Sequence, residues 1–343
     1  MALSAEEEEA LELAWGAPGS DERVAIESMS LEDLLADIPS LGGVGSFGVD
    51  LKDSPYDIYV HGYATFDWYK KREAPNTFDM HYFNILVGAE LGENITTELQ
   101  LEHEHGDEIS IRYAQVDLRL RDDLYLRAGI FLVPFGVYNE FLYPEFLSKL
   151  PRYPLVSAYR YVVPTAWNDT GIQLFGEQAL RSTGLLQWNV YATNGLRQID
   201  DPETPHIDDG GAIREMRGNT RDKASGGKAL GARVTLSPVK VFNIGASAYS
   251  GAYTEDDSQR ITFLGAHTGL EFERFTFRTE GAYVLQGSSL GTLKKLALYS
   301  RASFKVKKWL EPATGLDISI ADPSAGMKIG LLGSINLYPY HKH

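Results

Sequence analysis

The sequence predicts an all-β protein, a transmembrane antiparallel β-barrel of roughly 14–16 strands that follows a short, partly helical acidic N-terminal extension. Three observations predict this fold: residues alternate between apolar and polar from Asp57 onward, short connections alternate with long ones, and charges keep to one face of each strand. No run of about 18 apolar residues is present, which argues against a membrane-spanning helix. Barrel strands scarcely register on a hydropathy scan, so a barrel remains compatible with this observation.

Residues 1–53 form the acidic extension. This stretch has thirteen acidic residues against Arg23 and Lys52, and so holds −11 of the net charge of −15. Ser30-Leu31-Glu32-Asp33 resembles a helix capping box, and Gly42 to Gly48 predicts a flexible linker. The run Glu6 to Glu9 lies where a signal peptide needs basic and apolar residues, so export requires a signal that this numbering lacks. We therefore expect a periplasmic extension over 1–53 and a barrel over 54–343.

Fourteen strands are predicted from the period-two alternation. Their ranges are 57–68, 78–91, 94–104, 109–120, 123–133, 170–178, 184–194, 229–237, 240–250, 261–271, 274–285, 293–305, 310–320 and 326–338. Short turns are expected at one end of the barrel. Longer loops are expected at the other end, at 70–77, 134–169, 195–228, 251–260 and 286–292. The loops at 134–169 and 195–228 are much the longest, and we expect both on the extracellular side.

Residue parity assigns the two faces of each strand. Charges at mid-bilayer on the lipid face cost about 2–4 kcal/mol, so their confinement to one parity identifies the lumen. The predicted lumen-facing charges are Glu98, Glu102, Asp117, Arg119, Arg127, Arg233, Arg278, Glu280, Arg301 and Lys328. With about fourteen strands the interior exceeds what side chains fill, which favours a channel, although ion pairs that fill the interior are the alternative. Aromatic girdles are expected at Trp68, Tyr69, Phe131, Phe135, Trp188, Tyr249, Tyr283, Trp309 and Tyr338.

Short motifs carry a family resemblance. Gly129 to Gly136, Pro164 to Gly171, His61-Gly62-Tyr63 and Ile335 to Pro339 resemble segments of Gram-negative porins similar to the phosphate-selective porin O/P family and its uncharacterised relatives. The resemblance implies a trimeric channel of roughly sixteen strands, in which a long loop folds inward as a constriction. In that family phosphate selectivity rests on a ladder of lumenal Arg and Lys. Here the barrel is slightly acidic, so we do not carry phosphate specificity over.

The loop from Pro134 to Trp167 is the candidate constriction, because opposite charges around a narrowing filter ions by sign. An outward loop that makes only surface contacts is the alternative. The candidate constriction residues are Glu140, Glu145, Lys149, Arg152, Arg160 and Asp169. Asp and Gly residues in the loop from Leu196 to Lys228 could bind calcium, but the spacing is not that of an EF-hand and a solvated loop is favoured. No metal site and no cofactor are predicted.

These patterns lead us to expect a water-filled outer-membrane channel for passive diffusion of small hydrophilic solutes or ions. Its expected partners are the lipid bilayer, lipopolysaccharide and two further copies of the chain in a homotrimer. The alternative is a structural or assembly barrel that docks a periplasmic or outer-membrane partner through its acidic extension. There is no Cys, which excludes thiolate catalysis, and no catalytic constellation stands out, so no enzyme is expected. A basic stripe is missing too, which excludes a nucleic-acid partner.

Overall fold

The structure is a computed structural model that describes residues 44–50, 57–70, 76–104, 108–142, 162–180, 183–199, 213–217, 227–288, 291–321 and 326–338. The chain divides into two compact units, Met1–Asp37 and Ile38–His343, and every described residue belongs to the second. The helices predicted near the N-terminus lie outside the described residues. None of the helices in the described ranges is long and apolar enough to cross a membrane.

All fourteen predicted strands are present, and one more strand precedes them. Their bounds are β1 Val44–Asp50, β2 Asp57–Lys70, β3 Asn76–Glu90, β4 Ile95–Glu104, β5 Glu108–Arg121, β6 Leu124–Leu132, β7 Asn168–Leu180, β8 Gly184–Thr193, β9 Ala229–Val239, β10 Phe242–Ala252, β11 Arg260–Glu271, β12 Phe275–Ser288, β13 Gly291–Phe304, β14 Leu310–Ile320 and β15 Lys328–Leu337. A π-helical turn at Tyr138–Leu142 and a 3-10 turn at Ile213–Met216 interrupt the two longest connections.

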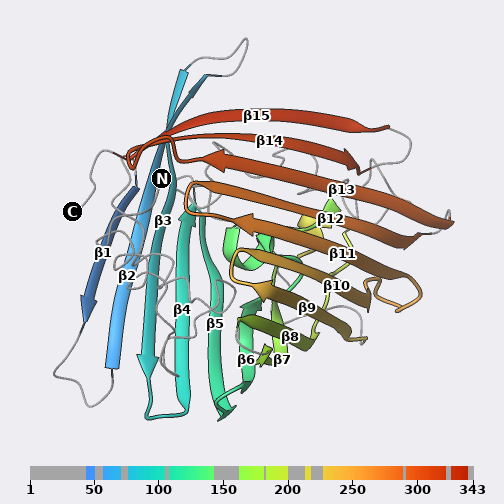
Figure 1. The fold of residues 1–343 in the computed structure, drawn as a ribbon. Helices are drawn as coiled ribbons and strands as arrows, with labels where there is room; N and C mark the ends of the chain where they lie inside the picture. Colours follow the sequence, from blue (N-terminus) through green and yellow to red (C-terminus); the bar gives the residue numbers. More distant parts are fainter. Residues whose placement is uncertain are drawn as a thin grey trace. The chain divides into compact units, whose positions relative to one another are not determined.

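The strands form a single sheet in which each strand is hydrogen-bonded to its neighbours in sequence, from β1 to β15 (Figure 1). Every neighbouring pair in this sheet is antiparallel, as a meander with hairpin connections requires. The connections also segregate as predicted: those that follow β3, β5, β7, β9, β11 and β13 are short, and the two longest follow β6 and β8. We refer to these two ends of the sheet as the short-turn end and the long-loop end.

The two faces of the sheet differ in polarity along the predicted parity. On β5, Val116 and Leu118 are exposed, whereas Gln115, which has the opposite parity, is buried. The exposed face bears a band of large apolar side chains that includes Val116, Leu118, Leu120, Leu126, Ile172, Val190, Leu230, Val234, Ile244, Leu264, Leu296, Ile329, Leu331, Ile335 and Leu337. An exposed apolar surface of this extent, on the outside of an antiparallel meander whose other face is polar, is typical of a sheet that faces lipid. The fold is therefore that of a transmembrane antiparallel β-barrel protein.

The structure corrects two expectations about the connections. The stretch from Gly42 to Gly48, expected as a flexible linker, contributes to β1, which pairs with β2 from Val44↔Thr65 to Asp50↔Tyr59. Glycine lowers strand propensity, yet the free edge of β2 supplies backbone partners that sequence patterns alone do not reveal. The loop expected at 286–292 is shorter than predicted, because β12 and β13 continue to Ser288 and from Gly291.

Candidate functional site

The connection between β6 and β7 turns back onto the inner face of the sheet, and we call its described parts, Val133–Glu140 and Val162–Trp167, the inner segment. Its two ends are held together by the Asn139 side chain. Asn139 Nδ2 donates to the carbonyl oxygens of Val133 (2.9 Å) and Trp167 (2.8 Å), and Asn139 Oδ1 accepts from the Trp167 N–H (2.6 Å). The Val133 N–H also donates to the Trp167 carbonyl (2.8 Å), which extends the β6–β7 ladder by one step. The segment therefore leaves and re-enters the sheet at one fixed neck.

A β-bulge at the neighbouring β4–β5 pair supports this neck. The register shifts from Gln100↔Tyr113 to Leu101↔Ile111, so Arg112 is the extra residue. Asn168 Nδ2, at the start of β7, donates to the carbonyls of Ile111 (2.9 Å) and Arg112 (3.0 Å). Because a bulge leaves backbone groups without ladder partners, these bonds tie the neck to the irregular point in the sheet.

Aromatic rings seat the inner segment on the far wall of the sheet, which is formed by β10, β11 and β13. Trp167 lies edge-on to Tyr249 (ring centroids 4.6 Å apart) and tilted against Phe263 (5.2 Å). Phe135 meets Phe263 edge-on at 5.8 Å. Tyr138 meets Tyr299 in the same way at 5.6 Å. These rings are fully buried, and such pairs contribute about 0.5–1.5 kcal/mol each beyond their buried area.

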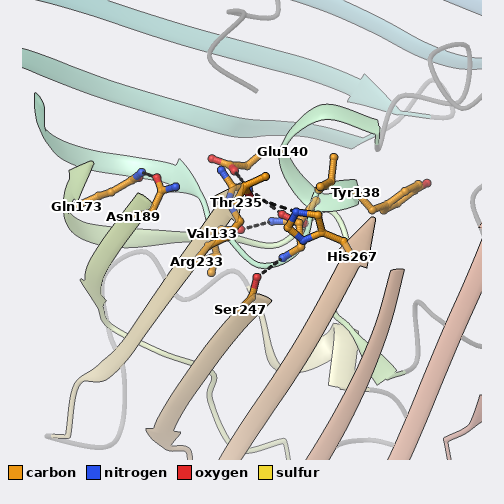
Figure 2. A network of polar contacts seen from close by, with 12 residues as sticks. Val133, Tyr138, Glu140, Gln173, Asn189, Arg233, Thr235, Ser247 and His267 are labelled. Carbon is orange, nitrogen blue, oxygen red and sulfur yellow. Dashed lines mark hydrogen bonds and ion pairs between the residues drawn. The ribbon is translucent and has the colours of Figure 1, made fainter. Parts of the chain in front are cut away.

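Two charged side chains hold the segment by its backbone. Glu280 on β12, 1% exposed, accepts hydrogen bonds from the N–H groups of Val137 (2.8 Å) and Tyr138 (3.0 Å). Arg233 on β9 donates to the Gly136 carbonyl (2.7 Å) and forms an ion pair with Glu140. A hydroxyl adds a third contact, since Ser247 Oγ accepts from the Gly136 N–H at 3.0 Å. Figure 2 shows Arg233 of β9 and Ser247 of β10 beside this turn, with Glu140 of the turn itself next to Arg233. The described parts of the segment thus lie on the inner face of the sheet.

Two glycines make the fit possible. Gly136 has φ +65°, and a Cβ there would lie 1.9 Å from the Glu280 carboxylate. On the wall, a Cβ at Gly265 would lie 2.7 Å from the ring of Phe135. A side chain at either position would therefore displace the segment.

Arginines on the described inner face stand beside carboxylates. The ion pairs are Arg112 with Glu102 and Glu104 (3.1 Å to Glu104), Arg127 with Asp117 (2.7 Å), Arg233 with Glu140, Arg278 with Glu271 (2.9 Å), and Arg301 with Asp317 (2.6 Å). Arg127 also interacts electrostatically with Glu98. In two of these clusters one arginine faces two carboxylates. The described wall thus has more negative than positive groups.

Only two of the six predicted constriction residues, Glu140 and Asp169, are among the described residues, and they lie in different elements. Glu140 lies on the inner segment, in contact with Arg233. Asp169, 2% exposed, accepts from the N–H of Gly195 (2.6 Å) and Thr170 (2.7 Å), so it fixes the start of the β8–β9 connection. Glu145, Lys149, Arg152 and Arg160 lie outside the described residues.

Most of the predicted lumenal charges share the inner face: Glu98, Glu102, Asp117, Arg127, Arg233, Arg278, Glu280 and Arg301. Arg119 and Lys328 follow the same parity but are exposed near strand ends. Arg112 and Glu104 were not among the predicted lumenal charges: Glu104 has the parity of Glu98 and Glu102, whereas Arg112 does not follow the parity of its strand. The bulge turns Arg112 inward although it has the parity of lipid-facing Ala114 and Val116; a charge at such a position is itself a signal of a bulge.

The girdle prediction was wrong for Phe131, Phe135 and Tyr249. All three are buried, and the last two form part of the aromatic seat. Trp68, Tyr283 and Trp309 are exposed, as a girdle requires. In the described residues no group of three acidic, His or Cys side chains could hold a metal ion, and most of the loop considered for calcium lies outside them.

Comparison with known proteins adds little beyond the fold. No family model matches the chain. An uncharacterized protein of Aquifex aeolicus (strain VF5) is 23% identical over 242 residues, which are 66% of this chain and 52% of that protein. The chain therefore spans about half the length of this curated relative.

The similar solved structures are outer-membrane proteins. They include OmpF of Salmonella typhi in complex with daunomycin (TM-score 0.47, 12% identity, 80% of this chain and 78% of that chain). A loop L8 deletion mutant of OmpT from Vibrio cholerae has a TM-score of 0.44 and 10% identity, over 86% of this chain and 99% of that chain. The outer membrane channel DcaP of Acinetobacter baumannii has a TM-score of 0.40 and 11% identity, over 81% of this chain and 96% of that chain. Likeness at this level says nothing about solute or mechanism, and membership of the phosphate-selective porin O/P family is not confirmed.

Proposed function

We propose that the protein is a porin of the Gram-negative outer membrane, a water-filled channel through which small hydrophilic solutes or ions diffuse passively. The observation that supports this most is the inner segment, held inside the sheet by Glu280, Arg233 and the aromatic seat. A segment fixed on the inner face in this way narrows the interior of the barrel. Ion pairs along the wall keep the remaining interior polar, and a polar interior favours water.

The apolar band contacts lipid and lipopolysaccharide, and three copies assemble as a homotrimer, as the family resemblance implies. Flow is driven by the solute gradient alone, so the protein is not an enzyme and needs no cofactor.

Planar-bilayer recording of the purified protein tests the proposal. Stepwise openings in groups of three, with a current that grows with salt concentration, are the expected result. A protein that inserts but remains silent would contradict the channel. Single rather than triple steps would retain the channel and remove the trimer.

A further inference from the structure

Charge is unevenly distributed over the turns at the short-turn end of the sheet. The neighbouring turns that follow β9, β11 and β13, residues 240–241, 272–274 and 305–309, have five basic residues and one acidic residue. The turns that follow β3 and β5, residues 91–94 and 122–123, have three acidic residues and no basic one. The positive charge at this end is therefore confined to the sector from β9 to β14.

The backbones of these three basic turns are joined by hydrogen bonds. The Glu271 N–H donates to the Val241 carbonyl (2.9 Å), and the Lys305 N–H donates to the Arg274 carbonyl (2.8 Å). All five basic side chains are exposed, and we call them the basic rim: Lys240, Arg274, Lys305, Lys307 and Lys308. In the described part of the chain Arg274, Lys305 and Lys307 form no ion pair, so no described carboxylate neutralises their charges.

The acidic sector treats its arginines differently. At the turn after β5, Arg121 lies 3.3 Å from Asp123, and Arg119 lies 3.6 Å from Asp122. These two cations therefore have anionic partners within the protein. The cations at Lys305 and Lys307 remain available to an anion from outside.

Large apolar side chains lie between the cations of the basic rim. Phe275 and Phe304 are register partners and are both exposed. Beyond the strand ends, exposed Phe272, Val306 and Trp309 continue this apolar surface into the turns themselves. Aromatic side chains gather where a membrane meets water, because their rings lie among the lipid headgroups. The basic rim therefore lies at headgroup depth, at the edge of the apolar band.

An exposed mixture of rings and cations matches the chemistry of an anionic lipid. The rings contact the acyl chains below the headgroup, and Lys and Arg form strong hydrogen bonds with phosphate oxygens. Each cation near an anionic membrane surface favours binding by roughly fivefold. We propose that the basic rim binds the headgroups of anionic phospholipids in the leaflet at the short-turn end. This rests on the proposed function, which makes that leaflet the periplasmic one.

Spin-labelled lipids test the preference. The full chain is placed in phosphatidylcholine vesicles with a trace of spin-labelled phosphatidylglycerol or spin-labelled phosphatidylcholine, and the fraction of immobilised label is compared. We expect more phosphatidylglycerol than phosphatidylcholine to be immobilised, with a smaller difference at high salt, because ions screen exposed charges. Lys305→Gln with Lys307→Gln should lose most of the preference. The matched control, Arg119→Gln with Arg121→Gln, removes the same charge at the same end and should keep it.

No preference in the wild type, or an equal loss in the control, would overturn the lipid site. Planar-bilayer recording separates this outcome from failure of the channel. A protein that is silent in bilayers yet prefers phosphatidylglycerol would refute the channel and support the lipid site. A conducting protein without the preference would do the reverse.

Trp309 reports whether the lipid binds at the basic rim itself. Its fluorescence is the difference between the wild type and Trp309→Phe. We expect acyl-brominated phosphatidylglycerol to quench this contribution more strongly than brominated phosphatidylcholine, and the two lipids to quench equally in Lys305→Gln with Lys307→Gln. Equal quenching in the wild type would refute a site at the basic rim, even if phosphatidylglycerol were immobilised elsewhere on the protein.

Discussion

Removal of the Glu280 carboxylate should release the inner segment. In the protein this group accepts hydrogen bonds from the N–H groups of Val137 and Tyr138, at 2.8 and 3.0 Å. Hydrogen bonds to a charged acceptor contribute about 1.5–3 kcal/mol each, so Glu280→Ala should weaken docking by about 3–6 kcal/mol. Since a tenfold change in an equilibrium corresponds to about 1.4 kcal/mol, the docking equilibrium falls by about two to four powers of ten. Glu280→Gln keeps one acceptor oxygen without the charge and should give an intermediate effect.

Single-channel recording measures this change. We expect larger and noisier openings in the order wild type, Glu280→Gln, Glu280→Ala, because a released segment no longer narrows the interior steadily. Glu311→Gln is the matched control: this carboxylate is also buried on the inner face, but it accepts from Ser303 (2.6 Å) and Tyr338 (2.9 Å) and not from the inner segment. Unchanged openings in Glu280→Ala, with normal insertion, would show that the segment does not narrow the water path.

Three further changes test other parts of the account. Gly265→Val should displace Phe135, whose ring lies 2.7 Å from the new Cβ, and should raise conductance, whereas Gly333→Val, with no heavy atom within 4 Å of its Cβ, should not. Arg112→Ala leaves Glu102 and Glu104 buried without their cation and should cost about 3–5 kcal/mol of unfolding free energy in a urea titration; Arg119→Ala, exposed near a turn, should be close to neutral. Reversal potentials in a salt gradient should show a preference for cations, because Arg127 and Arg112 each face two carboxylates, and Glu98→Gln should reduce that preference. A preference for anions would contradict this reading of the wall and would leave the channel itself intact.

Strand pattern was predictable from sequence because it depends on local alternation. Each strand from β2 to β15 was anticipated to within a few residues, and parity placed Glu98, Arg127, Arg233 and Glu280 on the inner face. Lipid contact forces this pattern, since a charge on the wrong face is costly at every strand. Arg112 was missed because one bulge reverses parity for the rest of the strand.

The site itself depends on contacts between residues far apart in the chain, and these leave no local signal. Glu280 meets Tyr138 from 142 positions away, and nothing near either residue indicates the pairing. Phe135 and Tyr249 resembled girdle residues because both lie near strand ends. Only the inward turn of the inner segment brings Phe135 onto Phe263 and Trp167 onto Tyr249. β1 was missed for a similar reason, because its glycines indicate a linker and its pairing is supplied by β2.

The most direct test of the account asks whether the inner segment borders the water path. Val137 is suitable, because its side chain is half-buried while its N–H is bonded to Glu280. In Val137→Cys, a charged methanethiosulfonate reagent added during recording should lower the single-channel current stepwise. The same reagent should have no effect on Leu331→Cys, on the lipid-facing side of β15. A current that is unaffected in Val137→Cys, although mass spectrometry shows the thiol has reacted, would contradict a pore narrowed by this segment.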